Sequence, residues 1–325
     1  MLVLVTGATG FLGSHVAERL VQQGAQVRVL TRGRSRLTYL DGLEAERVEG
    51  DLRDHESLAR AVQGVDIVVH AAGLTMGAAL SEAEFHEVNA LATGRLAKAA
   101  REAGVRRFVY VSSQAAQGPN HDGSSRAPDP PRPISAYGRS KLAGEYAALA
   151  ERDPMSVAVL RPPVIYGERD RALLPLYRLA KLGIVPVYGS GKNRISVVHV
   201  QDAAEAIAAA ALAPGPSGAV YTFSDGATHT WETLVEAFGR AYGRVPRLLR
   251  VPPALYAGAG LLAAVAQAAL RRPLPLSPDQ VRHMHAPAWL ADNEAITREL
   301  GWKPLIDVRE GFERTVRWYR QQGWL

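Results

Sequence analysis

The sequence contains no cysteine among its 325 residues. Disulfides, thiolate zinc sites, iron–sulfur clusters and a cysteine nucleophile are therefore excluded. It also lacks a block of basic residues and any interleaving of basic with aromatic side chains, so nucleic acid is not an expected partner although the formal net charge is +6. The first residues, MLVLVTGATGFLG, lack the basic segment of a signal peptide, and we expect a cytoplasmic protein.

The nine histidines do not form a pattern typical of a metal site. His283 and His285 flank a methionine, but no carboxylate pattern surrounds them, and we interpret them as structural or cleft residues. His70 and His199 fall in predicted strands, where we expect hydrogen-bonded core histidines rather than catalysts. We therefore predict that no metal is bound.

Long apolar runs are also scarce. An uncharged run about as long as a membrane span requires covers residues 251–270, between Arg250 and the pair Arg271–Arg272. It is rich in alanine and glycine, begins with two prolines after its valine, and has few large apolar residues. We therefore predict a helix that covers an apolar substrate cleft rather than a membrane span, and peripheral contact with lipid is left open.

What is present is typical of a globular α/β protein, with 47% hydrophobic and 22% charged residues. Short β-rich runs alternate with helical patterns through the first half, which predicts a doubly wound parallel sheet (Rossmann fold) built from right-handed βαβ units. The expected strands are at 2–6, 26–31, 66–72, 107–113 and 156–162, and the expected helices are at 11–24, 54–64, 84–104 and from Ser135 onward.

After about residue 166 the alternation loosens. Two more strands are predicted at 195–200 and 219–223, and Asp202 is predicted to cap the helix between them. The remainder is a helical pattern broken by prolines, which indicates a smaller, mostly helical substrate domain. The predicted dinucleotide-binding domain covers 1–166 plus 193–223, and the predicted substrate domain covers 167–192 plus 224–325.

Three glycines, Gly7, Gly10 and Gly13, occur where the first predicted strand leads into the first predicted helix, and Gly13 lies in the first turn of that helix. Glycine at this spacing permits a tight turn and a close approach of the backbone to a pyrophosphate, which then lies at the helix N-terminus. This position in a βαβ unit predicts a dinucleotide cofactor.

The end of the second predicted strand bears on which cofactor is bound. An NAD-binding chain usually has an acidic residue there for the ribose 2′-hydroxyl, whereas this chain has VLTRGRSR. A cation suits a 2′-phosphate, and we assign that role to Arg32, the first residue after the strand. Arg34 and Arg36 are interpreted as solvated. NADP(H) is therefore the preferred cofactor, with NAD(H) left open.

Tyr137 and Lys141 lie one turn apart at the start of a predicted helix, in SAYGRSKLAGE. Residues i and i+4 share a helix face, and a nearby cation favours the phenolate form of a tyrosine. Such a tyrosine can exchange a proton with an alcohol or a carbonyl. An isolated pair of this kind is more often a surface pair, so its meaning depends on the rest of the chain.

Taken together, these segments resemble the extended short-chain dehydrogenase/reductase family over nearly the whole chain. TGATGFLG resembles the pyrophosphate loop, GDLRD the adenine-contacting segment, HAAG the segment beside the cofactor, VSSQAAQG the serine segment and LRPPVIYG the nicotinamide-flanking segment. By this resemblance the cofactor-binding residues are Gly7, Thr9, Gly10, Phe11, Leu12, Gly13, Arg32, Asp51, Leu52, Ala71, Ala72, Gly73, Asn89, Tyr137, Lys141, Pro163 and Val164.

The resemblance also implies a catalytic set of Ser113, Tyr137 and Lys141. Tyr137 is the implied general acid or base, Lys141 lowers its pKa and holds the nicotinamide ribose, and Ser113 bonds the substrate oxygen. Counting back five residues from Gly118 selects Ser113 rather than Ser112.

Departures from the family pattern bear on the substrate. Gln117 stands where nucleotide-sugar epimerases usually have an aromatic residue, and Gln114 follows the serine where sugar dehydratases have aspartate. The C-terminal half instead resembles the 3β-hydroxysteroid dehydrogenase-like branch, which includes reductases of acyl-chain ketones. The proline-rich loop at 117–134 is expected to border the substrate.

We therefore predict an NAD(P)-dependent oxidoreductase acting on a secondary alcohol or ketone of a largely apolar, steroid-like or acyl-chain molecule. The alternatives are a nucleotide-sugar epimerase or dehydratase with tightly bound NAD, and a non-catalytic cofactor-binding regulatory protein. The intact serine, tyrosine and lysine argue against the last. The expected partners are the small-molecule substrate and, at most, a second copy in a homodimer.

Overall fold

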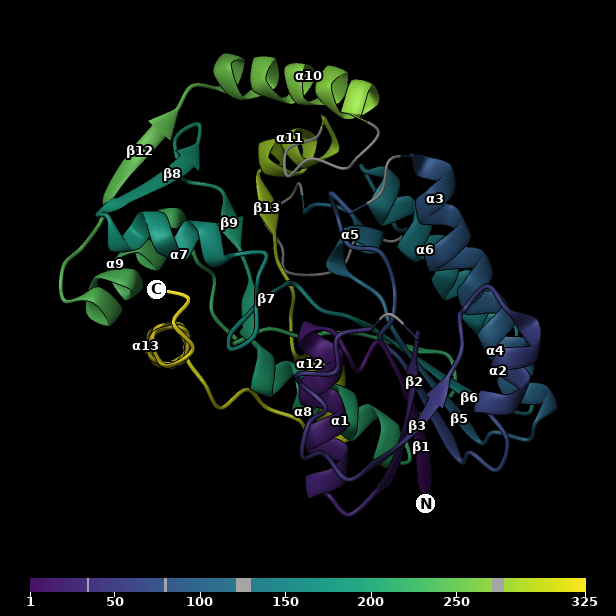
Figure 1. The fold of residues 1–325 in the computed structure, drawn as a ribbon. Coiled ribbons are helices and arrows are strands. Elements are labelled where there is room, and N and C mark those ends of the chain that lie inside the picture. Colours follow the sequence, from purple (N-terminus) through teal and green to yellow (C-terminus); the bar gives the residue numbers. More distant parts are fainter. Residues whose placement is uncertain (34, 79–80, 121–129, 271–277) are drawn as a thin grey trace.

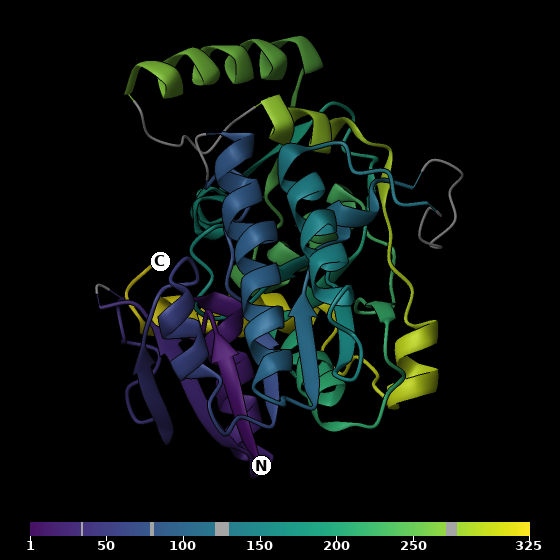
Figure 2. The same ribbon diagram turned by 90° about the vertical axis from the view of Figure 1, so that its right-hand side faces the viewer.

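A seven-stranded parallel sheet forms the centre of the structure (Figures 1 and 2). The computed structural model describes residues 1–33, 35–78, 81–120, 130–270 and 278–325. In spatial order the strands are β11 (Ala219–Thr222), β6 (Ser156–Arg161), β5 (Arg107–Val111), β4 (Ile67–His70), β1 (Leu2–Thr6), β2 (Gln26–Thr31) and β3 (Ala45–Glu49). From β1 the chain adds β2 and β3 on one side of the sheet and then β4, β5, β6 and β11 on the other side. The order of the strands therefore reverses between β1 and β4, which confirms the predicted doubly wound fold.

Helices cover both faces of this sheet (Figure 1). One face carries α1 (Phe11–Gln22) and α8 (Val200–Leu212). The other carries α2 (His55–Ala61), α4 (Ala92–Glu102) and α6 (Ala136–Leu149). Short α3 (Glu82–His86) continues through a π-helical turn at Glu87–Leu91 into α4, and α5 (Gln114–Gln117) precedes α6.

The alternation of side chains along the central strand β1 divides the core between these two layers. Val3 and Val5 are fully buried against α1 and α8, whereas Leu4 is fully buried toward α2 and α4. Apolar residues therefore occupy consecutive positions in β1, as a strand covered on both faces requires. This burial places the glycine loop directly after β1 at the carboxyl edge of the sheet.

All five strands predicted in the first half are present, but β3 was not predicted. Its sequence, AERVE, has three charged residues, and it forms the exposed edge of the sheet. An edge strand with little buried surface has no apolar pattern by which it could be recognised. The predicted strand at 195–200 is divided at Ser196 into β9 (Arg194–Ile195) and β10 (Val197–His199), and neither joins the main sheet.

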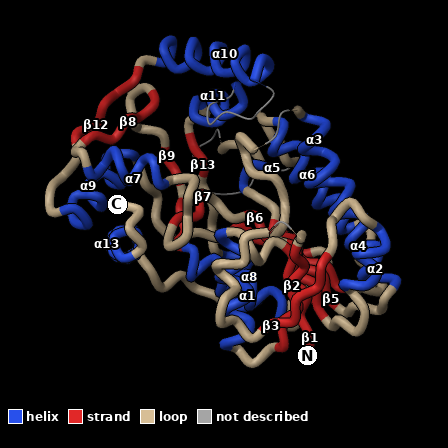
Figure 3. The backbone as a smooth tube through the Cα atoms, in the orientation of Figure 1, coloured by secondary structure: helices blue, strands red, loops and turns tan. Residues whose placement is uncertain are grey.

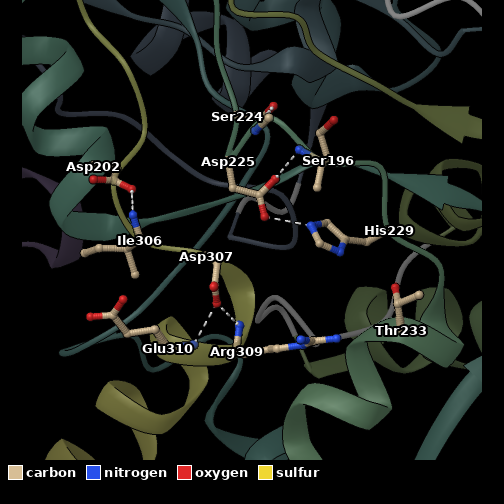
Figure 4. A network of polar contacts seen from close by, with 12 residues as sticks. Ser196, Asp202, Ser224, Asp225, His229, Thr233, Ile306, Asp307, Arg309 and Glu310 are labelled. Carbon is tan, nitrogen blue, oxygen red and sulfur yellow. Dashed lines mark hydrogen bonds and ion pairs between the residues drawn. The ribbon is translucent and has the colours of Figure 1, made fainter.

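The prediction that Asp202 caps α8 is wrong, because His199 occupies the N-cap position and its Nδ1 accepts from the Gln201 N–H at 3.3 Å. Asp202 lies within the first turn, and its carboxylate accepts from the backbone N–H groups of Leu305 at 3.1 Å and Ile306 at 2.8 Å (Figure 4). The Asp202 carboxylate therefore holds the C-terminal segment against α8 and does not bond the free N–H groups at the start of α8.

In the described residues after β6, helices are combined with three two-stranded parallel sheets (Figure 3), so this region has more strand than predicted. The small sheets pair β7 (Val164–Tyr166) with β10, β8 (Ile184–Tyr188) with β12 (Arg247–Val251), and β9 with β13 (Ala288–Trp289). The helices are α7 (Leu174–Lys181), α9 (Trp231–Tyr242), α10 (Pro253–Leu270), α11 (Pro278–His285), α12 (Glu294–Leu300) and α13 (Val308–Gln321).

A separate aromatic core holds this second region together. The ring of Phe238 in α9 lies 4.3 Å from that of Phe312 in α13 and 5.0 Å from that of Tyr177 in α7, measured between centroids. All three side chains are buried. Since Asp307 caps α13 by accepting from the N–H groups of Arg309 and Glu310 (Figure 4), the C-terminal helix has a defined start against this core. Two cores are compatible with the two predicted domains, whose boundaries stay a prediction.

Candidate active site

A cavity of about 960 Å³ opens at the carboxyl ends of the central strands. Its lining comes from the loops after β1, β2, β4 and β5, from the start of α6 and from the second region. Of the residues predicted from the sequence, those in the lining are Gly7, Thr9, Gly10, Phe11, Leu12, Gly13, Arg32, Asp51, Leu52, Ala71, Ala72, Gly73, Ser113, Tyr137, Lys141, Pro163 and Val164. Segments up to 157 positions apart in the chain thus meet where ligands of doubly wound sheets bind.

The glycine loop has the shape that a pyrophosphate requires. Gly7 has φ +76°, and a Cβ at this position would lie 2.7 Å from the backbone nitrogen of Ala72. A Cβ at Gly13 would lie 2.2 Å from the Gly7 carbonyl oxygen. Helix α1 begins directly after Gly10, with no side-chain cap and no acidic residue in its first turn. Its first N–H groups therefore face the cavity edge without a competing anion, as a dinucleotide phosphate needs.

Charged side chains gather at the far end of this cavity, beyond β2. Arg32 and Asp51 line it, and a second, polar cavity beside it is bordered by Arg32, Gly33, Glu49, Asp51 and Arg53. Asp51 accepts from the N–H of Arg53 at 2.9 Å, and this bond is the main reason why the pKa of Asp51 is lowered. Within the described ranges no ion pair of the Arg32 guanidinium is found. Glu49, the last residue of the unpredicted strand β3, was not predicted from the sequence to lie near the cofactor end of the cavity.

Asn89, which was expected at the cofactor, does not appear in the cavity lining. It is buried in the π-helical turn, where its Oδ1 accepts from the Leu74 N–H at 2.8 Å and its Nδ2 donates to the Leu74 carbonyl at 3.0 Å and to Ser140 Oγ at 3.1 Å. The side chain therefore fixes the loop after β4 against α6. Direct contact with a cofactor stays a prediction.

Tyr137 stands in the first turn of α6, which Ser135 caps by accepting from the Gly138 N–H at 3.0 Å. A side-chain hydrogen bond joins Tyr137 to Ser113, whereas the hydroxyl of Ser112 donates to Glu145 at 2.5 Å. Of the two adjacent serines, Ser113 is thus the one oriented toward the tyrosine. The two hydroxyl groups together form a polar spot in the middle of the cavity.

The expected effect of Lys141 on Tyr137 is not found, because burial raises the pKa of the phenol above its ordinary value. Lys141 is itself buried, and this burial lowers its pKa to about 7. Its Nζ donates to the Val111 carbonyl at 2.7 Å and lies 4.3 Å from the centre of the Tyr110 ring. The tyrosine is therefore a protonated donor at neutral pH, and the lysine is anchored beside the cavity by the carbonyl at the end of β5.

A buried ion pair supports this arrangement, and sequence reasoning missed it. Glu145, one turn after Lys141, accepts from Arg161 Nη2 at 2.6 Å and Nε at 2.9 Å, and both side chains are buried. The charge of Glu145 raises the pKa of Lys141 and so partly opposes the effect of burial. The only sequence signal was the i,i+4 spacing of Lys141 and Glu145 in α6.

Of the histidines predicted to be structural, His70 and His199 are buried away from the cavity, His285 is exposed, and His283 lines the cavity. His70 is fully buried with its two ring nitrogens 2.7 Å from Thr6 Oγ1 and 3.0 Å from Thr93 Oγ1, and burial lowers its pKa to about 3. His199 is also fully buried. His283 does line the cavity and stacks on Trp289 with ring centres 3.8 Å apart. Within the described residues, no group of three or more His, Asp or Glu could hold a metal ion.

The half of the cavity beyond Tyr137 is largely apolar and aromatic. It includes Leu173, Leu176, Ile195, Trp231, Leu234 and Trp289. Among the described lining residues the only Lys and Arg side chains are Arg32, Arg53 and Lys141, of which the first two lie at the β2 end. Residues 121–129 of the loop expected to border the substrate lie outside the described residues, and its described part does not appear in the lining.

The prediction that the run at 251–270 covers the cleft is wrong. It does form helix α10, but none of its described residues lines the cavity, and Leu262 is 73% exposed. An apolar run with no polar face cannot indicate which neighbour it contacts. The described helices include none that is long and apolar enough to cross a bilayer.

The site therefore combines a nucleotide-phosphate cradle, a protonated tyrosine with a serine beside it, a buried lysine and an apolar chamber. This arrangement can hold a dinucleotide and deliver a proton to an oxygen placed at Ser113 and Tyr137.

Comparison with known proteins agrees with this geometry. The model of the NAD-dependent epimerase/dehydratase family matches residues 3–222. The chain is 35% identical over 327 residues to a ceramide reductase of Caulobacter vibrioides, covering 100% of this chain and 96% of the relative. It is 31% identical over 334 residues to a 2-alkyl-3-oxoalkanoate reductase of Stenotrophomonas maltophilia, covering 97% and 98% respectively.

A solved structure supports the same assignment. The dTDP-glucose 4,6-dehydratase of Streptomyces venezuelae, with NAD bound, shares 29% identity with a TM-score of 0.80, covering 100% of this chain and 98% of that chain. The chain belongs to the NAD-dependent epimerase/dehydratase family and is an NAD(P)-dependent enzyme of the extended short-chain dehydrogenase/reductase type.

Proposed function

We propose that the protein reduces a ketone carried by a largely apolar molecule, of steroid-like or acyl-chain type, to a secondary alcohol. The observation that carries this proposal is the chamber beyond Tyr137, which is apolar and aromatic and has no Arg or Lys among its described lining residues. The names of the two reductase relatives support this proposal. One name describes the reduction of a ceramide, and the other describes the reduction of an oxoalkanoate, which carries a ketone. In this proposal 1–166 with 193–223 bind the cofactor, and 167–192 with 224–325 bind the substrate.

The proposed chemistry assigns a role to each polar group. When bound, a nicotinamide cofactor supplies the hydride, and the reaction also needs one proton. Tyr137 donates that proton from its hydroxyl to the carbonyl oxygen, and the raised pKa keeps the donor protonated at neutral pH. Ser113 donates a hydrogen bond to the same oxygen as negative charge develops there. Lys141, held at the Val111 carbonyl, is the group that would bind the nicotinamide ribose.

The first test varies the length of the substrate. Because each CH₂ group buried in an apolar cavity contributes about 0.8 kcal/mol, we expect kcat/KM for a series of linear ketones to rise by about three- to fourfold per added CH₂ until the chamber is full. The measurement is NADPH oxidation at 340 nm. A flat series would contradict an apolar chamber.

A nucleotide-sugar epimerase or dehydratase is the second candidate, because a structural relative that binds NAD acts on dTDP-glucose by its name. A nucleotide diphosphate carries charge that enzymes usually neutralise with Arg or Lys. Measurements on the purified protein distinguish the two candidates. A nicotinamide cofactor that stays bound through purification, and turnover of nucleotide sugars without added cofactor, would favour the second candidate.

We further propose that NADPH is preferred to NADH because of Arg32. Its guanidinium lines the cofactor end of the cavity and has no ion-pair partner there among the described residues. Charge-assisted hydrogen bonds to a phosphate are worth about 1.5–3 kcal/mol each, which corresponds to a preference of roughly tenfold to a hundredfold. Glu49 and Asp51 nearby oppose part of this preference.

The corresponding test is Arg32→Asp, with kcat/KM measured for both cofactors. We expect the ratio of NADPH to NADH efficiency to fall by at least about tenfold, since a carboxylate repels the 2′-phosphate. Arg28→Ala is the matched control, because Arg28, in the strand that precedes Arg32, pairs with Glu46 outside the cavity. A wild type that prefers NADH, or an unchanged ratio in Arg32→Asp, would refute the assignment.

A further inference from the structure

We propose that helix α10, which lies in an arginine-rich segment of the sequence, docks the protein on the surface of an anionic lipid bilayer. The helix has 18 residues, none of them charged. Leu255, Leu261, Leu262 and Val265 are each exposed by 64% or more. Soluble proteins rarely leave so many large apolar side chains together in solvent, and such a surface usually marks an interaction site.

Among the described residues, one side of α10 has no protein neighbour. In both views the helix lies at the end of the molecule farthest from the N-terminus and is set apart from the body above α11 (Figures 1 and 2). The less exposed residues Tyr256, Gly260 and Ala264 recur every four positions and define the inner side. The leucines at 255 and 262 lie seven positions apart on the opposite side. The outward side therefore presents leucine where a surface helix normally presents charge.

In the sequence, the excess positive charge falls in the segment that contains this helix, although Arg250 of that segment pairs with Glu232 at 3.3 Å. From residue 237 to residue 278 there are six arginines and no acidic residue. Removing these six from the 38 basic residues of the chain leaves 32, which equals its 32 acidic residues. The whole formal excess of positive charge thus belongs to the segment that contains α10, and the remaining chain is balanced.

This charge decides between the two occupants that an exposed apolar helix can have. Two copies packed through α10 would bring two such arginine-rich segments together, and like charges repel. An anionic bilayer instead attracts them, by about fivefold in affinity for each arginine near its surface, while leucine side chains enter the acyl boundary. A lipid surface is therefore complementary to both features.

The docked position has a consequence for the active site. Helix α10 packs on α11, and His283 and Met284 of α11 line the substrate half of the cavity. A bilayer in contact with α10 would lie next to the part of the protein that borders the apolar chamber. The docking itself rests on the surface of α10 and not on the proposed reaction.

The test is flotation of the full-length protein with extruded vesicles, without any substrate. We expect binding to vesicles of 30% phosphatidylglycerol in phosphatidylcholine, and at least about tenfold weaker binding to phosphatidylcholine alone. Leu262→Asp should lower binding by at least about tenfold, and Arg247→Glu should lower binding to the anionic vesicles only. Leu305→Asp is the matched control, because Leu305 is 82% exposed but lies between α12 and α13.

Two measurements keep the outcome interpretable. Circular dichroism melts should be equal for the wild type and the three variants, since all of these side chains are exposed. Light scattering gives the oligomeric state. The proposal is overturned if the wild type does not float with anionic vesicles, if Leu262→Asp floats as well as Leu305→Asp, or if Leu262→Asp instead abolishes a dimer without changing flotation.

Discussion

Replacing Tyr137 with phenylalanine is expected to lower kcat for ketone reduction by about 10²-fold or more, while the affinity for the cofactor stays within about twofold. The substitution removes one hydroxyl group, which is the proton donor in the proposed reaction and the hydrogen-bond partner of Ser113. The aromatic ring and its packing on Phe85, at 5.8 Å between centroids, are kept. The loss should therefore appear in the chemical step, measured by single-turnover oxidation of NADPH.

The control is Tyr146→Phe in the same helix, because Tyr146 is 60% exposed and does not line the cavity. This variant should match the wild type in turnover and in thermal stability. Cofactor affinity, followed by quenching of tryptophan fluorescence, separates a catalytic loss from a binding loss. If Tyr137→Phe turned over normally, or lost cofactor affinity in proportion to its activity, the role of Tyr137 as proton donor would have to be abandoned.

The parts of the structure that could be predicted are those determined by short segments. The strand β1 and the glycine loop after it lie within the first thirteen residues, and burial on both faces of the sheet leaves a recognisable run of apolar residues. The cap at Ser135 and the i,i+4 pair at Tyr137 and Lys141 are equally local. Because parallel strands end at one edge, the loops that follow them could be expected to meet.

The parts that could not be predicted depend on contacts between distant segments. In the sequence, Glu145 cannot be distinguished from an ordinary helical glutamate. Its ion pair forms only because the fold places Arg161 of β6 next to it. Asp202 has the sequence pattern of a helix cap, but its carboxylate accepts hydrogen bonds from the backbone N–H groups of Leu305 and Ile306 instead. The direction of the pKa change at Tyr137 was mispredicted for the same reason, since burial by the surrounding fold raises the pKa and outweighs the hydrogen bond to Ser113, which lowers it.

The second large effect is expected at the buried pair of Glu145 and Arg161. Removing one member of such a pair leaves the other charge buried without compensation, at a cost of about 3–5 kcal/mol. Arg161 is 8% exposed in its side chain and makes two hydrogen bonds to Glu145, so little water can replace the lost carboxylate. We therefore expect Glu145→Ala to lower the free energy of unfolding by about 3–5 kcal/mol, measured by urea titration.

A double variant distinguishes the electrostatic origin of this loss from a simple cavity. In Glu145→Leu with Arg161→Met neither charge remains, and apolar side chains of similar size fill the space. Replacing a buried ion pair in this way is often neutral or stabilising, so the double variant should be more stable than Glu145→Leu alone by at least about 2 kcal/mol. The surface pair of Arg298 and Glu294, with exposed fractions of 60% and 76%, is the control, because separating it should cost under about 1 kcal/mol. Equal stability of the single and double variants would show that Arg161 does not depend on Glu145, and the pair would then have no structural role behind Lys141.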